Sequence, residues 1–254
     1  MNFIYSFKSE WLKKKRSLSS WLVITGAFFT PVIILIARLV RNDTLPAEIK
    51  NPSFWGRLWY SSWQSMAIFL LPLGVILTAS LITQLEFKNN TWKQLHTTPQ
   101  SLTTIFIAKL AVILVMMLQF FVLFNIGIYL SGVLPMLLTG NGYPRQPIPF
   151  KYFFKEGAYY FIDCLPIVAL QYLISLQFKN FLVPVGGGII MWILSVSVLS
   201  WKYGYAIPYS YCGLYYLRGR DTNYTVHIHL LAAAWFAGLT LLSYVLYITK
   251  EEKG

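Results

Sequence analysis

Six stretches of this chain are apolar for long enough to cross a lipid bilayer as helices. A membrane-spanning helix needs about 20 mostly apolar residues, because 20 residues rise roughly 30 Å. Only helices and closed barrels satisfy the backbone inside lipid, and these continuous runs lack the alternation of barrel strands. The sequence therefore predicts an all-α, polytopic membrane protein. The six predicted spans are residues 21–40, 62–82, 110–130, 158–176, 181–199 and 230–248.

The composition argues against several classes of soluble protein. Hydrophobic residues make up 56% of the 254 residues and charged residues only 12%, whereas a soluble domain carries roughly a quarter charged residues. A soluble enzyme, a disordered chain and a nucleic-acid binder are therefore disfavoured. We assign the net charge of +12 to loops held against anionic lipid, so the expected partner of this charge is membrane lipid and not nucleic acid. One membrane domain, residues 1–254, is expected, with its bundle at 21–248 and a tail at 249–254.

The orientation in the membrane rests on one basic run. Lys13, Lys14, Lys15 and Arg16 directly precede the first predicted span, which is the position that weighs most under the positive-inside rule. The basic residues are divided almost evenly between the two sides of the membrane, so their total number does not fix the orientation. The run at residues 13–16 therefore decides it. We expect both termini in the cytoplasm.

Motifs for nucleotide binding and hydrolysis are missing from the sequence. No glycine is followed by lysine, so the phosphate-binding pattern G-x-x-x-x-G-K-[ST] does not occur. The H-E-x-x-H pattern of zinc proteases and the G-x-S-x-G nucleophile turn are also missing. His227 and His229 lie two apart, but a metal site there would need further ligands. We predict no catalytic residue, no metal site and no cofactor bound by this chain.

The first 20 residues combine aromatic and basic side chains at helical spacing. Ile4, Phe7 and Trp11 fall on one helical face, and lysines surround it. This pattern is typical of a helix that lies flat in the inner membrane interface. A plain cluster of topology-setting positive charge is the simpler alternative. The residues assigned to the predicted interfacial helix are Phe7, Glu10, Trp11 and Lys13.

One predicted inner loop, residues 86–101, has the features of a docking segment. Thr91 is placed to cap a short helix that Pro99 would end. Trp92 and Leu95, three positions apart, would then share one face and fit a groove of a cytoplasmic partner. A solvated connector is the alternative. The predicted coupling residues are Glu86, Lys88, Thr91, Trp92, Lys93, Leu95 and Pro99.

This loop resembles the E-x-x-x-x-T-x-x-x-L-x-x-x-P-x-S signature of type-2 ABC exporter permeases. Glu86, Thr91, Leu95, Pro99 and Ser101 carry it here, and Lys109 follows as the third predicted span begins. The N-terminal run 9–13 is similar to the E-W-x-K start of small permeases, most closely the bacteriocin-immunity (lantibiotic-protection) type. The chain departs from the pattern at Asn90, where many relatives carry glycine.

The resemblance implies a membrane-spanning permease subunit of an ABC exporter in a bacterial cytoplasmic (inner) membrane. Residues 86–101 would form a coupling helix that docks on a separate ABC ATPase, which would bind ATP and Mg²⁺. Two permease subunits, identical or paralogous, would pair. The expected function is export of a peptide or lipid-like substrate. A non-transporting membrane assembly or regulatory protein is the alternative, and a membrane enzyme is the third interpretation.

The outer segment 201–216 is rich in Trp and Tyr, whose rings prefer the membrane interface. Pro208 and Gly213 divide it into short pieces. We interpret it as a re-entrant or interfacial hairpin, similar to the outer re-entrant segment of the family, with an ordinary aromatic belt as the alternative. An acid, Asp163, lies in the fourth predicted span, where acids are costly and often functional, although a structural role is the alternative. The residues assigned to a substrate path are Asp163, Tyr205, Tyr209 and Tyr211.

Cysteine labelling tests the predicted topology. In a background without Cys164 and Cys212, a cysteine that replaces Arg145 or Arg220 should react with an impermeant maleimide added outside the cell. A cysteine at Lys93 or Glu252 should react only after the cells are opened. Labelling of position 93 from outside would contradict the topology.

Overall fold

Every regular element in the described part of the chain is a helix, which confirms the all-α prediction. The computed structural model describes residues 3–15, 17–88, 101–144, 146–218 and 227–251. Five helical runs within these residues are long and apolar enough to cross a membrane. They are α2 (Leu18–Val40), the continuous run of α4 (Phe54–Ser65), η2 (Met66–Leu70) and α5 (Leu71–Lys88), α7 (Leu102–Leu138), α8 (Phe150–Gln177) and α11 (Ile228–Glu251).

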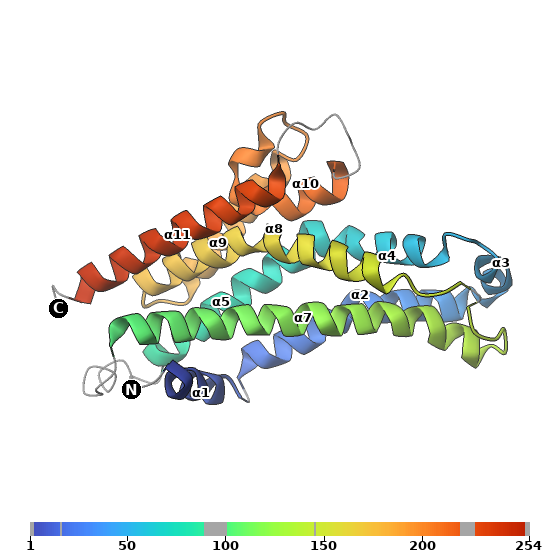
Figure 1. The fold of residues 1–254 in the computed structure, drawn as a ribbon, viewed down its shortest axis with the longest axis horizontal. Helices are drawn as coiled ribbons and strands as arrows, with labels where there is room; N and C mark the ends of the chain where they lie inside the picture. Colours follow the sequence, from blue (N-terminus) through green and yellow to red (C-terminus); the bar gives the residue numbers. More distant parts are fainter. Residues whose placement is uncertain (1–2, 16, 89–100, 145, 219–226, 252–254) are drawn as a thin grey trace.

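These helices run side by side along the length of an elongated bundle (Figure 1). α2 packs along α7, and α8 packs against both α11 and α5. The amino-terminal helix α1 (Phe3–Lys14) lies against α7. Two short elements, η1 (Asn42–Thr44) and α3 (Leu45–Ile49), turn the chain from α2 to α4 at the end of the bundle opposite α1.

The predicted span at residues 181–199 is not confirmed as a span. The helix there, α9 (Leu182–Ser197), has 16 residues, which corresponds to a rise of about 24 Å. This is shorter than the hydrocarbon core of a typical bilayer, about 30 Å. The chain then continues through η3 (Gly204–Ala206), η4 (Pro208–Ser210) and α10 (Tyr211–Arg218). The re-entrant character of this segment stays a prediction.

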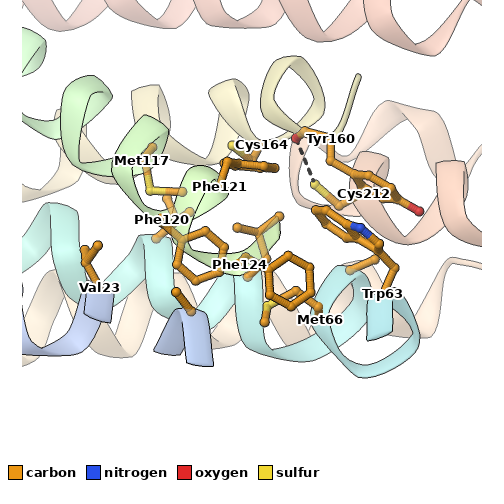
Figure 2. Close-up of a cluster of buried hydrophobic side chains, with 14 of the residues drawn as sticks. Val23, Trp63, Met66, Met117, Phe120, Phe121, Phe124, Tyr160, Cys164 and Cys212 are labelled. Atoms are coloured by element: carbon orange, nitrogen blue, oxygen red, sulfur yellow. Dashed lines mark hydrogen bonds between the residues drawn. The ribbon is translucent and has the colours of Figure 1, made fainter. Parts of the chain in front are cut away.

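An aromatic core holds α4, α7 and α8 together. The Trp63 ring stacks on the Tyr160 ring with centroids 3.7 Å apart, and it meets the Phe124 ring edge-on at 5.1 Å. Figure 2 shows these rings facing one another from three different helices. Trp63 and Phe124 are completely buried. Ring pairs in such geometries add about 0.5–1.5 kcal/mol each beyond the burial of their area.

Gly127 allows α2 and α7 to approach closely. A Cβ atom at this position would lie 2.8 Å from Cγ of Pro31 on α2. Small residues at helix contacts are typical of membrane bundles, because van der Waals packing replaces the hydrophobic effect there.

Proline interrupts the second membrane run, and another helix compensates. Pro72 has no N–H to offer the carbonyl of Ile68, four residues earlier, and the preceding residues form the π-helical turn η2. The Trp192 side chain on α9 donates from Nε1 to that Ile68 carbonyl at 2.9 Å. The indole therefore fixes α9 to the irregular turn of its neighbour.

A double-mutant cycle tests this compensation. Trp192→Phe should destabilise the protein in detergent by about 1–3 kcal/mol, because it leaves a shielded carbonyl without its donor. In a Pro72→Ala background, which restores a backbone N–H, the same change should cost clearly less. Thermal unfolding of the four proteins measures the coupling, and equal costs in both backgrounds would contradict the explanation.

Candidate functional site

The amino-terminal helix and the ends that flank the predicted coupling loop lie at one end of the bundle (Figure 1). α1, the last turn of α5, the first turn of α7 and the carboxyl end of α11 are all found there. Five of the predicted coupling residues lie outside the described part of the chain, and for two more only the backbone, in α5, is described. Their role stays a prediction. The five are Thr91, Trp92, Lys93, Leu95 and Pro99, and the two are Glu86 and Lys88.

A buried ion pair joins α1 to α7 at this end. Nζ of Lys109 lies 2.9 Å from Oε2 of Glu10, and the two side chains are 3% and 8% exposed. Lys13 pairs with the other carboxylate oxygen of Glu10. Charges buried this far are stable only when they are paired and hydrogen-bonded. Glu10 therefore fixes α1 against the membrane bundle through its charge.

Lys14 strengthens the same contact. Its ammonium lies 3.5 Å from the centroid of the Trp11 ring and 3.4 Å from Oε1 of Gln119 on α7. Burial lowers the pKa of Lys14 below its ordinary value, because desolvation disfavours the charged form.

The predicted apolar face of α1 is divided in the structure. Phe7 and Trp11 are half-buried and pack against the core, whereas Ile4 is 60% exposed. Helix formation over α1 is as predicted, but the position of α1 in the membrane interface stays a prediction. The sequence did offer a signal for the ion pair, because Glu10 is an acid among lysines and Lys109 is a cation within an apolar run.

The residues that follow the predicted loop anchor it to two membrane helices. Ser101 caps α7, since its Oγ accepts from the backbone N–H of Thr104 at 3.3 Å. The hydroxyl groups of Thr103 on α7 and Tyr244 on α11 are 2.8 Å apart. The end of the loop is thereby connected to both helices.

The embedded acid of α8 has a partner that the sequence analysis did not identify. Asp163 is fully buried, and its Oδ1 lies 2.8 Å from Nδ1 of His229 on α11. The His229 ring also stacks on Tyr159 with centroids 4.2 Å apart. Oδ2 of Asp163 has no partner among the described residues. The pair connects α8 to α11.

Two of the tyrosines assigned to the substrate path are buried and hydrogen-bonded to residues other than Asp163. Tyr209 and Tyr211 are buried. The Tyr209 hydroxyl donates to Oε1 of Gln171 at 3.0 Å, and the Tyr211 hydroxyl donates to the carbonyl of Tyr205 at 2.8 Å. These contacts favour a packing contribution from both rings. A role of Asp163, Tyr205, Tyr209 and Tyr211 in a substrate path stays a prediction.

Comparison with known proteins places the chain in a family. The family model described as "ABC-2 family transporter protein" matches residues 6–195, which is more than half of the chain. The chain belongs to this ABC-2 family of transporter proteins. No curated protein and no solved structure matches it.

Family membership and five long apolar helices together make the chain a multi-pass membrane protein and a permease component of an ABC transporter. The family implies association with an ABC ATPase. The matched region includes α1, Lys109 and the whole of the predicted coupling loop, whereas α10 and α11 lie beyond it.

Breaking the ion pair between Glu10 on α1 and Lys109 on α7 should lower the stability of the folded protein. Glu10→Gln leaves Lys109 charged and buried, so we expect a loss of about 3 kcal/mol or more in the free energy of unfolding. Adding Lys109→Met should recover much of the loss, because it removes the buried positive charge that Glu10 no longer neutralises. Lys13→Gln, which removes the more exposed partner, should cost under about 1 kcal/mol. Thermal unfolding in detergent compares these variants, and a tolerated Glu10→Gln would show that the pair is not needed.

Proposed function

We propose that this ABC-2 family protein is an exporter permease subunit that a separate ABC ATPase drives through residues 86–101. Family membership is the observation that carries the proposal. The chain has no phosphate-binding loop of its own, so the energy of ATP hydrolysis has to be delivered by another protein. ATP and Mg²⁺ would be bound by that ATPase.

The contacts around the loop support this route. The loop connects α5 to α7, and Ser101 begins α7 with a capping bond. The bond between Thr103 and Tyr244 extends the anchorage to α11. A push on the loop would therefore reach two membrane helices directly, while the Glu10–Lys109 pair holds α1 beside them.

The substrate we propose is a peptide or lipid-like molecule taken from the membrane. An apolar hollow of about 290 Å³ between α2, α5 and α7 supports it, with Leu22, Phe29 and Leu70 in its lining. An acyl chain or an apolar side chain matches such a surface. The similarity of residues 9–13 to small immunity permeases favours bacteriocin-like peptides, and with them a bacterial cytoplasmic membrane as the location.

A second permease subunit, identical or paralogous, would complete the transporter. α2 and α11 are the least buried of the five membrane runs. Their apolar side chains, such as Ile33 at 53% and Leu241 at 66% exposure, would be covered by lipid and by the second subunit.

Loss of coupling tests the proposed function. Replacing Trp92 and Leu95 with alanine should weaken association with the ATPase and abolish substrate-stimulated ATP hydrolysis, since a buried aromatic anchor often contributes about 2 kcal/mol or more. The control, Trp201→Ala with Leu217→Ala, removes the same residue types from exposed positions on other segments. Copurification with the ATPase and hydrolysis assays read out both variants.

Two outcomes would count against the proposal. If the loop variant still copurifies and couples normally, residues 86–101 are a plain connector. The second outcome is that the wild-type permease binds the ATPase although substrate does not stimulate ATP hydrolysis and ATP hydrolysis does not move substrate. In that case a non-transporting assembly or regulatory protein is the better interpretation.

A further inference from the structure

A small hollow with aromatic walls lies where α10 covers α4 and α8. Its volume is about 200 Å³, and every described residue in its lining is Trp or Tyr except Glu156. Trp59, Tyr152 and Tyr215 are among the rings that form the walls, one from each of the three helices. Neither the transport proposal nor the predicted path residues make use of this site.

Two pairs of rings in the lining meet at steep angles and form corners of the hollow. The planes of Trp59 and Tyr152 cross at 68°, and those of Tyr160 and Tyr215 cross at 71°. Tyr160 is held in place by the Trp63 ring stacked on it, as Figure 2 shows. The aromatic walls are therefore supported by the core of the bundle.

The acid in the lining has no cationic partner in the described part of the chain. Oε2 of Glu156 accepts a hydrogen bond from the Tyr215 hydroxyl at 2.8 Å. None of the described Lys, Arg or His residues lies within ion-pair distance of this carboxylate or lines the hollow. A carboxylate among aromatic rings attracts positive charge, and ring faces attract it as well.

We propose that this hollow binds a small organic cation, a trimethylammonium group of the choline type. Aromatic cages with a carboxylate suit quaternary ammonium groups, because cation–π attraction needs no hydrogen-bond donor on the ligand. A cavity of about 150 Å³ holds a benzene-sized molecule, so this one accepts a head group and not a whole peptide. The group comes either from a free cation or from a phosphatidylcholine head group.

Binding of choline to the purified wild-type protein tests the proposal first. The protein is kept in a maltoside detergent, which carries no ammonium group, and binding is measured by titration calorimetry. We expect saturable binding of choline and at least roughly tenfold weaker binding of 3,3-dimethyl-1-butanol, its uncharged isostere. Equal binding of the two compounds, or no binding of choline, would overturn the proposal.

Two matched variants locate the site. Glu156→Gln keeps the size of the side chain and removes its charge, so choline affinity should fall by roughly tenfold. Asp43→Asn removes an acid that is exposed on η1 and does not line the hollow, so affinity should not change. Unfolding temperatures establish that both variants are folded. An equal effect of both changes would show that only net charge matters and would overturn the assignment.

Nanodiscs distinguish the two sources of the ammonium group. In discs of phosphatidylcholine, a site that takes the lipid head group should bind added choline at least roughly tenfold more weakly than in discs of phosphatidylglycerol. Equal choline binding in the two discs assigns the site to a free cation. Both results support a trimethylammonium site, and lack of choline binding in both discs would reject it.

Discussion

Inside a bilayer, a backbone carbonyl that loses its helical donor has no water to replace it. Four prolines lie inside the long helical runs of the described residues: Pro31, Pro72, Pro135 and Pro166. At Pro72 and Pro135, a side chain of another helix donates to the carbonyl that the proline cannot serve. Pro72 cannot serve the carbonyl of Ile68, which accepts from Trp192. Pro135 cannot serve the carbonyl of Ser131, which accepts from Nη1 of Arg38 at 2.6 Å. Arg38 also pairs with Glu48 at 2.9 Å. Breaks in two helices are thereby turned into contacts that hold α9 to η2 and α2 to α7.

Two buried acidic side chains in this protein are also paired with a side chain of another helix. The pair of Glu10 and Lys109 and the pair of Asp163 and His229 each join two different helices. A charge left alone at either place would be strongly unfavourable, so each pair selects one register of its helices. Glu156 differs from these acids, because its only described partner is a neutral hydroxyl. This difference is the reason for assigning it to a ligand and not to packing.

The sequence predicts five of the membrane runs well, because hydropathy over 20 residues is a local property. The predicted span 181–199 is not confirmed, because its helix stops at Ser197 and composition does not reveal where backbone pairing ends. The contact of Glu10 with Lys109 joins residues 99 positions apart, and no local pattern encodes such a distance. Aromatic content does not distinguish a membrane belt from a core, so the burial of Tyr209 and Tyr211 needed the fold. The coupling loop rests on sequence and family alone.

One long helix has a consequence for how the two ends of the bundle can communicate. α7 continues from Leu102 to Pro135 without an internal proline, a length of roughly 50 Å. Near its first turns it is fastened to α1 through Lys109, and near its last turns it is fastened to α2 through Arg38. α7 therefore links these two contacts as one uninterrupted helix. A tilt of α7 at its α1 end would be carried along this helix to its contact with Arg38 at the other end.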